Sequence, residues 1–317
     1  MPQNDVAAGI FEMSSKNKHW KLGILGGPDV GNYSLSPQMH RAALHAAGLK
    51  GEYKAYPVKP ENLSAWLEKE AFELDGFNVT MPHKEVVAQW AAEHPKTGML
   101  ERLLAKGLGS VNTVSIRNGR LAVVSTDGAG FLRGLSEKVP LKRLRGASVL
   151  LLGAGGAAQV LASALTTAQT ENRELVGIGL LHVWNRTSER AKRLAEKINS
   201  PKDETSCSAR AVEDLSEIDF EKIDFIVNAT AAGMRGSDPL EMPAGSLRKE
   251  QVVCDIVYDP KETPLIRSAR QAGCTVVTGD AMLAGQGAEA FRFWTGVDEM
   301  YPAMKTALEK KWNDCCA

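Results

Sequence analysis

Apolar residues are concentrated in short runs along the second half of the chain. Each run is nearly free of charge, as strands are when helices cover both faces of a parallel sheet. Segments with helical spacing at 157–169 and 188–198 separate the first three runs. We therefore predict strands and helices that alternate around a parallel sheet. The predicted strands read SVLLLG, LLHVWN, DFIVNAT, VVCDIVY and CTVVTG.

The first half has a more mixed pattern. One predicted helix has Ser36 as its N-cap, Pro37 in its first turn and Gly48 at its end. Asn118 and Gly119 lie between two β-rich runs, a sequence typical of a two-residue hairpin turn. The first half is thus predicted to be a second α/β domain. Its predicted strands are 21–26, 52–58 and 76–80, and its predicted helices are 37–47, 61–69 and one that begins at residue 84.

Bulk composition limits the functions that the chain can have. Its 317 residues are about twice a typical domain, which favours two domains. Lys plus Arg and Asp plus Glu number 38 each, so net charge provides no attraction to nucleic acid or to a membrane. Five cysteines without C-x-x-C spacing, and a start without an apolar signal run, predict a cytoplasmic protein with reduced thiols. Residues 1–18 are polar and aperiodic, and we expect a disordered tail there.

A glycine-rich turn follows the run SVLLLG. It contains Gly153, Ala154, Gly155, Gly156 and Ala157 at a strand-to-helix junction. Glycines allow the backbone to approach a pyrophosphate, which then meets the free N–H groups of the helix N-terminus. The pattern differs from G-x-G-x-x-G in its last member, Ala158. A tight turn without a ligand remains the alternative interpretation.

The end of the next predicted strand indicates which dinucleotide would bind. NAD sites usually have a carboxylate at this position, which accepts from the ribose 2′-OH. Here the strand is followed by Asn185, Arg186, Thr187 and Arg190, with no carboxylate at its tip. Guanidinium groups suit a 2′-phosphate, so we predict NADP rather than NAD. The alternative is a helix start with solvated arginines.

The stretch GFNVTMPHK contains the first candidate catalytic group. In a strand Asn78 and Thr80 point the same way, Pro82 ends the ladder, and Lys84 follows at a helix start. An amide, a hydroxyl and an ammonium group are therefore expected near one strand end. A Lys–Asp salt bridge that braces a domain junction is the alternative role for this lysine.

Further polar side chains occur near predicted turns. Ser34 and Ser36 precede a helix, Asn112 lies in SVNTV, and Asp127 lies in STDGAGF. Together these groups suit a small polyhydroxylated acid. No histidine or cysteine spacing indicates a metal, so a side chain must handle any proton transfer. We also expect most histidines to lie on the surface or on helices.

At this point the sequence closely resembles the shikimate dehydrogenase family. The resemblance implies reversible, NADP-dependent reduction of 3-dehydroshikimate to shikimate in aromatic amino acid biosynthesis. It also implies a substrate domain (1–126 and 282–317) that faces a Rossmann-type NADP domain (127–281) across a cleft. The matching motifs, spread over residues 20–298, are SLSPQMH, NVTMPHK, GSVNT, TDGAGF, GAGGAA, NRTSER, VNATAAGM, DIVYDPKETPL and GDAMLAGQGAEAFRFWTG.

The resemblance also implies roles for individual residues. Lys84 and Asp127 resemble the catalytic pair of the family. Met234 and Met282 either line the nicotinamide pocket or fill the core. The implied substrate-binding residues are Ser34, Ser36, Asn78, Thr80, Asn112, Tyr258 and Gln286. The implied cofactor-binding residues are Gly153, Ala154, Gly155, Gly156, Ala157, Asn185, Arg186, Thr187, Arg190, Thr230, Met234, Ile256, Gly279 and Met282.

The sequence departs from the family pattern at three places, one of which is the polar N-terminal tail, which has no counterpart in the family. Ser125 stands where the family usually has Asn, and the segment from Lys84 to Asn112 is longer than usual. A quinate/shikimate or aminoshikimate dehydrogenase on the same fold is the alternative enzyme. A catalytically weak NADP(H)-sensing homologue is the alternative from another class. We expect a monomer or homodimer with a small-molecule substrate.

Overall fold

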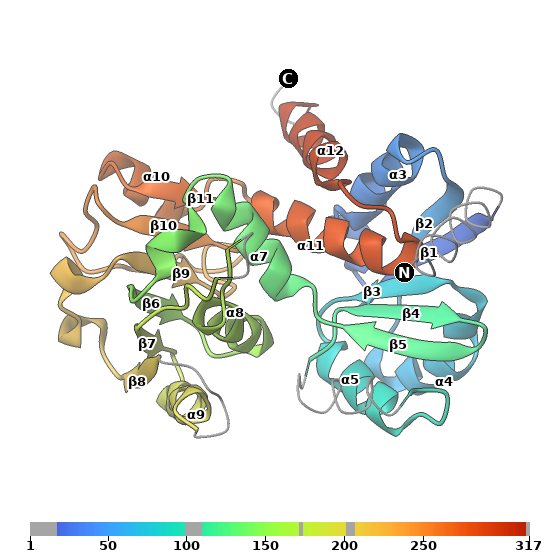
Figure 1. The fold of residues 1–317 in the computed structure, drawn as a ribbon, viewed down its shortest axis with the longest axis horizontal. Helices are drawn as coiled ribbons and strands as arrows, with labels where there is room; N and C mark the ends of the chain where they lie inside the picture. The colour runs from blue at the N-terminus through green and yellow to red at the C-terminus, as the bar shows by residue number, and fades with distance from the viewer. Residues whose placement is uncertain (1–17, 99–109, 171–173, 201–206, 315–317) are drawn as a thin grey trace, which may run out of the picture. The chain divides into compact units, whose positions relative to one another are not determined.

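The structure, a computed structural model, describes residues 18–98, 110–170, 174–200 and 207–314. The chain forms two compact units (Figure 1). Unit 1 comprises residues 1–126 and 287–317, and unit 2 comprises residues 127–286. Except for residue 18, the predicted disordered tail lies outside the described residues, as do residues 99–109 of the long segment after Lys84. None of the described helices combines the length and the apolar content needed to cross a membrane.

Unit 1 is built on a mixed five-stranded sheet. The strand order is β2-β1-β3-β4-β5, in which β4 runs antiparallel to both of its neighbours. Asn118 and Gly119 have positive φ angles of 50° and 72°, which confirms the predicted two-residue hairpin turn between β4 and β5. The strands are β1 (His19–Gly26), β2 (Lys50–Pro57), β3 (Gly76–Val79), β4 (Thr113–Arg117) and β5 (Arg120–Val124).

Helices cover both faces of this sheet. On one face Trp66 and Val87 belong to a core with Phe77 of β3 and Val114 of β4. On the other face α12 packs along α3, and the indole N–H of Trp294 donates a hydrogen bond of 2.8 Å to the Val114 carbonyl (Figure 1). The elements are α2 (Val30–Tyr33), α3 (Ser36–Ala46), η1 (Pro60–Asn62), α4 (Leu63–Glu68), η2 (Glu70–Glu73), α5 (Lys84–Glu93), the end of α11 (Gly279–Thr295) and α12 (Tyr301–Asp314).

Unit 2 contains a six-stranded sheet in which every strand is parallel. Its order, β11-β10-β9-β6-β7-β8, is that of a doubly wound dinucleotide-binding fold, and it confirms the predicted fold class. The edge strand β8 was not predicted because its sequence, SARAV, is short and carries a charge. The strands are β6 (Ser148–Leu152), β7 (Leu180–Trp184), β8 (Ser208–Val212), β9 (Phe225–Asn228), β10 (Val252–Asp255) and β11 (Thr275–Val277).

The helices of unit 2 lie on both faces of this sheet. Leu135, Leu161 and Leu194 pack on one face, and Leu265 packs on the other. Apolar residues on both faces explain why each strand is a continuous apolar run. The elements are α7 (Asp127–Ser136), η3 (Leu141–Leu144), α8 (Gly156–Thr166), α9 (Ser188–Ile198), η4 (Leu215–Glu217), η5 (Phe220–Lys222), α10 (Pro264–Gln271) and the start of α11.

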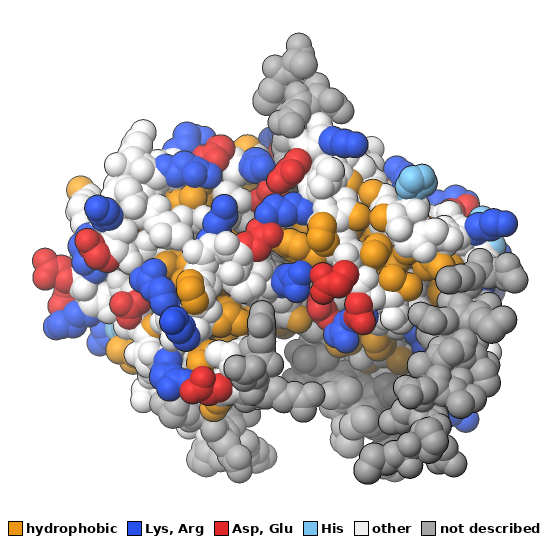
Figure 2. Space-filling view, turned by 45° about the horizontal axis from the view of Figure 1, so that its top comes forward, with side chains coloured by type: hydrophobic (Ala, Val, Ile, Leu, Met, Phe, Trp, Pro, Cys, Tyr) orange, Lys and Arg blue, Asp and Glu red, His pale blue; other side chains and the backbone are white. Residues whose placement is uncertain are grey.

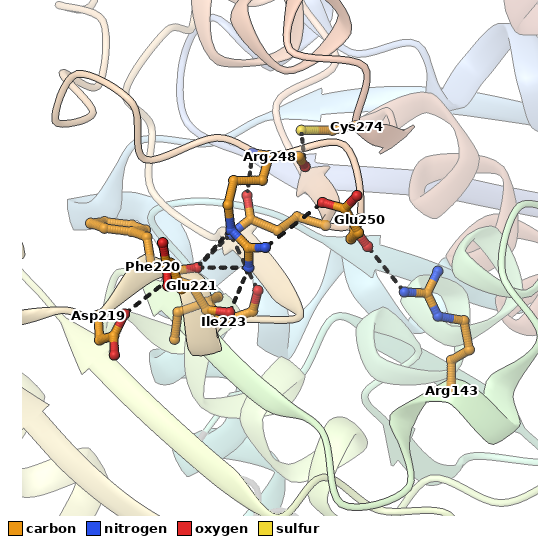
Figure 3. A network of polar contacts seen from close by, with 9 residues as sticks. Arg143, Asp219, Phe220, Glu221, Ile223, Arg248, Glu250 and Cys274 are labelled. Carbon is orange, nitrogen blue, oxygen red and sulfur yellow. Dashed lines mark hydrogen bonds and ion pairs between the residues drawn. The ribbon is translucent and has the colours of Figure 1, made fainter.

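A polar network fastens the amino ends of the strands in unit 2 (Figure 3). The Arg248 guanidinium donates to the main-chain carbonyls of Phe220 and Glu221, at 3.0 and 2.7 Å. The Arg248 carbonyl in turn accepts from the thiol of Cys274. These bonds tie the turn before β9 to the segment before β10, at the edge opposite the glycine-rich turn.

Two local expectations were wrong. Ser36 is the first residue of α3 rather than its N-cap, which is Leu35, and the Ser34 hydroxyl accepts the Ser36 N–H at 3.3 Å. Most histidines were expected on the surface or on helices, but His83, His94 and His182 are buried and lie outside helices, and His40 is buried within α3. Imidazole carries both apolar and polar character, so sequence pattern alone did not reveal their burial.

On the surface, acidic and basic side chains are interspersed on the face shown in Figure 2.

Candidate active site

The end of strand β3 carries two of the predicted substrate-binding residues, Asn78 and Thr80. Asn78 accepts a hydrogen bond of 2.7 Å from the Tyr53 hydroxyl and donates to the Asn112 carbonyl and the Thr113 hydroxyl, at 3.2 and 3.0 Å. The Thr80 N–H donates to Leu25 in β1, which extends the ladder by one bond. Asn78 is therefore fastened within unit 1 by three hydrogen bonds.

Asn112 is the centre of a buried hydrogen-bond network in unit 1. Its side-chain oxygen accepts from the Thr126 N–H at 2.8 Å, and its side-chain nitrogen donates to the Thr126 hydroxyl at 3.0 Å. Its main-chain carbonyl accepts from the Val79 N–H at 2.8 Å. The network joins the end of β3 to the segment that leaves β5.

The two predicted catalytic residues are connected through the backbone to neighbours of Asn112 and Thr126. Lys84 is the first residue of α5, and its carbonyl accepts from the N–H of Val111, the residue before Asn112. Asp127 is the first residue of α7 and directly follows Thr126. Asp127 is buried, with 3% of its surface exposed, and Lys84 is partly buried.

The two predicted carboxylate-binding serines lie at the start of α3. Ser34 is partly buried and Ser36 is buried. Ser125, the departure from the family pattern, has a buried hydroxyl without a hydrogen-bond partner among the described residues. The Ser125 hydroxyl therefore does not replace the hydrogen bond that the side-chain amide of an asparagine could make at this position.

Gln286 is fixed by a close crossing of α7 and α11. A Cβ on Gly130 would lie 2.7 Å from the Gln286 Cα, and one on Gly285 would lie 2.5 Å from the Gly130 carbonyl oxygen. A Cβ on Gly134 would likewise lie 2.9 Å from the Ala281 carbonyl carbon. Small residues are needed at this crossing because the two backbones approach within contact distance. The helix that begins with Asp127 thereby supports the backbone of Gln286.

The glycine-rich turn lies at the point where the strand order of the unit 2 sheet reverses. Gly153, after β6, has φ of 113°, and a Cβ there would lie 3.0 Å from the Ala229 carbonyl oxygen after β9. Helix α8 begins at Gly156, with Ala157 next and Gly155 as its N-cap, and no side chain caps it. A doubly wound sheet binds its ligand at this position, where helix N–H groups meet an anion. The turn therefore fits a dinucleotide pyrophosphate.

Residues after β7 complete the candidate nucleotide site. The side-chain oxygen of Asn185 accepts the Ala154 N–H at 3.2 Å, and its nitrogen donates to the Thr187 carbonyl at 2.9 Å. Asn185 thus ties the glycine turn to the loop that carries Arg186 and leads into α9, where Arg190 lies in the first turn. Both arginines are exposed and form no ion pair with any described residue. These cations fit the 2′-phosphate of NADP.

The remaining predicted cofactor residues have varied environments. Thr230 donates to Asn228, and Gly279 packs on the carbonyl of Ile256, where a Cβ would lie 2.5 Å from that oxygen. Met234 is exposed, whereas Met282 is buried in the core of unit 2. Tyr258, predicted near the substrate carboxylate, is partly buried in unit 2. The described residues contain no group of three or more His, Cys, Asp or Glu side chains that could hold a metal.

Sequence reasoning missed Asp255 at the same sheet edge. Its carboxylate accepts from the Asn228 amide, the Val257 N–H and the Thr263 hydroxyl, at 3.0, 3.0 and 2.7 Å. Burial raises the pKa of Asp255 to about 6, although these three hydrogen bonds oppose the rise. A carboxylate within the otherwise apolar run VVCDIVY was the available signal.

The sheet order, the glycine turn and the arginines define a dinucleotide-binding α/β protein. Residues 25–114 match the family described as the shikimate dehydrogenase substrate binding domain, and residues 136–256 match shikimate / quinate 5-dehydrogenase. The chain belongs to the shikimate dehydrogenase family.

Individual relatives match nearly the whole chain. Shikimate dehydrogenase (NADP(+)) of Exiguobacterium sp. is 38% identical over 278 residues, 87% of this chain and 93% of the relative. Shikimate 5-dehydrogenase from Thermus thermophilus, solved with NADP(H) and shikimate, has TM-score 0.75 and 36% identity over 92% of this chain and 99% of its own. Quinate dehydrogenase from Corynebacterium glutamicum, solved with NAD, has TM-score 0.77 and 30% identity over 93% of this chain and 100% of its own.

Proposed function

We propose that this protein catalyses the reversible, NADP-dependent reduction of 3-dehydroshikimate to shikimate. The connections around Asn112 carry the proposal. The Lys84 carbonyl accepts from the N–H of Val111, the residue before Asn112, and Asp127 directly follows Thr126, a hydrogen-bond partner of the Asn112 side chain. The likeness to a shikimate dehydrogenase solved with NADP(H) and shikimate supports the same substrate and cofactor. In this proposal the enzyme contributes to aromatic amino acid biosynthesis in the cytoplasm.

Substrate binding is assigned to neutral polar side chains. Ser34 and Ser36 bind the carboxylate with Tyr258 nearby. The hydroxyls are bound by Asn78, Thr80, Asn112 and Gln286. Buried amides and hydroxyls reject ligands that lack matching groups, since an unpaired buried polar atom costs about 1–3 kcal/mol. A polyhydroxylated acid is therefore preferred over an apolar one of equal size.

Proton transfer is assigned to the pair formed by Lys84 and Asp127. Oxidation of a secondary alcohol removes a hydride from carbon and a proton from oxygen. Lys84 takes the proton from the substrate oxygen and returns it in the reverse direction. Asp127 accepts a hydrogen bond from the reacting group, orients it and stabilises the positive charge on Lys84.

The residues of unit 2 hold the cofactor. When bound, the nicotinamide supplies the site that accepts or donates the hydride. The pyrophosphate lies against the turn that contains Gly153 and Gly155, at the N-terminus of α8. Arg186 and Arg190 bind the 2′-phosphate by charge-assisted hydrogen bonds.

A single spectrophotometric assay tests this function. Shikimate and quinate are each incubated with NADP⁺ and with NAD⁺, and formation of the reduced nicotinamide is followed. We expect the highest kcat/KM for shikimate with NADP⁺. A preference for quinate would indicate the alternative enzyme, which the likeness to a quinate dehydrogenase favours. Tight NADP⁺ binding without turnover of either acid would instead indicate a sensor.

A further inference from the structure

Tyr53 has a buried hydroxyl that lies among predicted substrate-binding residues. The side chain is on β2, with 1% of its surface exposed, and its hydroxyl donates to the Asn78 side-chain oxygen at 2.7 Å. Burial raises the pKa of Tyr53 well above its ordinary value, and the neighbouring Ser36 hydroxyl opposes this rise only in part. Tyr53 is therefore a protonated phenol at neutral pH, and its hydroxyl can donate.

The bonds to Asn78 fix which end of its amide faces Tyr53. The Asn112 carbonyl oxygen can only accept, so the Asn78 nitrogen must face it. The second N–H of the same nitrogen is directed to the Thr113 hydroxyl. Both N–H groups of Asn78 are thus used within the domain. The side-chain oxygen has two lone pairs, and Tyr53 donates to one of them.

The ring of Tyr53 is held by a stack of aromatic side chains. His40 lies parallel to it, with ring centroids 4.3 Å apart and planes inclined by 4°. Burial lowers the pKa of His40 to about 3, and neither ring nitrogen has a partner within hydrogen-bond geometry among the described residues. His40 therefore packs as a neutral imidazole ring, and the Trp294 ring of α11 contacts it. The bond to Asn78 fixes the direction of the Tyr53 hydroxyl within this stack.

We propose that Tyr53 is a positioning residue that locks the Asn78 amide, so that Asn78 offers the substrate only a hydrogen-bond acceptor. The inference rests on the proposed function and deepens it. At the position that faces Asn78 the site selects a ligand hydroxyl, which can donate, over a carbonyl, which cannot. Tyr53 itself stays behind Asn78 and exerts its effect through that side chain.

The test compares Tyr53→Phe in the wild-type and Asn78→Ala backgrounds. Phe keeps the stack on His40 and removes only the hydroxyl. In the wild-type background we expect KM for shikimate to rise roughly three- to tenfold, the effect of losing one buried hydrogen bond. KM for NADP⁺ should not change. In the Asn78→Ala background Tyr53→Phe should add nothing further, because the side chain that it positions is absent.

A matched control is available on the same strand. Tyr56→Phe removes a hydroxyl from a side chain that packs on Trp66, and it should leave both KM values unchanged. The proposal is overturned if Tyr53→Phe leaves KM for shikimate unchanged in the wild-type background. It is also overturned if Tyr53→Phe raises KM for shikimate by the same factor in the Asn78→Ala background, or if it raises KM for NADP⁺ by the same factor as KM for shikimate. If Tyr53→Phe does not fold, Thr113→Val, which frees one Asn78 N–H, should raise KM for shikimate alone. Wild-type turnover of shikimate reports separately on the proposed function.

Discussion

The Asn228 side-chain amide donates a hydrogen bond of 3.0 Å to the carboxylate of Asp255, and both residues lie at the carboxyl ends of neighbouring strands. Asn228 also accepts from the Thr230 hydroxyl, and Asp255 accepts from Val257 and Thr263. The pair therefore couples the two strand ends, β9 and β10, that flank the candidate cofactor position. Burial raises the pKa of one of the two residues, Asp255, to about 6.

Asp255→Asn should change how stability depends on pH. Burial raises the folded-state pKa of Asp255 from 3.8 to about 6, so the folded state binds more protons between these values. The stability of the wild type relative to the variant is therefore highest below pH 4 and falls as pH rises to 6. The fall should approach about 3 kcal/mol, the value of a two-unit pKa difference. Thermal unfolding of both proteins from pH 4 to 7 measures it, and parallel curves would contradict the prediction.

Arg248→Ala should destabilise unit 2 by about 1.5–3 kcal/mol, because bonds from a charged group to two main-chain carbonyls are lost. Chemical denaturation measures the free energy of unfolding. Arg143→Ala is the control, since this exposed arginine donates one bond to the Glu250 carbonyl and should cost well under about 1 kcal/mol. KM for NADP⁺ should stay constant in both, because the network lies at the opposite strand ends. Equal losses in both variants would refute the role of Arg248.

Lys84→Ala should lower kcat at saturating substrate by about 10²–10⁴-fold, the contribution of a general acid–base group. Binding of NADP⁺ should persist, because the cofactor residues are in the other unit. Lys59→Ala removes an exposed lysine of the same unit and should leave kcat unchanged. Retention of most of the wild-type kcat by Lys84→Ala would exclude the assigned proton transfer.

Arg190→Ala should raise KM for NADP⁺ by about 10–100-fold, since one charge-assisted hydrogen bond contributes about 1.5–3 kcal/mol. KM for NAD⁺, which has no 2′-phosphate, should change little. Lys197→Ala makes the same change in charge at the other end of α9 and serves as the control. Equal effects of Arg190→Ala on both cofactors would rule out a 2′-phosphate contact.

Gly130→Ala should destabilise the protein by about 1–3 kcal/mol and raise KM for shikimate. The new Cβ would meet the Gln286 backbone, and two packed helices must separate to accept it. Gly31→Ala is the stability control, since a Cβ there meets only Ala55 at 3.8 Å. A melting temperature of Gly130→Ala equal to that of Gly31→Ala would show that the crossing tolerates a methyl group.

Features that depend on local chemistry were predictable. The apolar runs of unit 2 predicted buried parallel strands, and Asn118-Gly119 predicted the hairpin turn, because these patterns act over a few neighbouring residues. The glycine-rich turn and the nearby arginines predicted a dinucleotide site for the same reason. The family motifs identified the remaining candidate residues individually, but they did not indicate what fastens each one.

Only the tertiary structure decided which hydrogen bonds each polar side chain makes. From sequence, Asn78 was one substrate-binding residue among several, whereas the fold uses both of its N–H groups and aligns its oxygen with Tyr53. The burial of His40 and the raised pKa of Asp255 arise from neighbours distant along the chain. Residue type and spacing determined which polar and titratable groups the chain carries. Hydrogen-bond partners and dielectric surroundings are properties of packing, so tertiary contacts determined which of these groups donate, which accept and which have a shifted pKa.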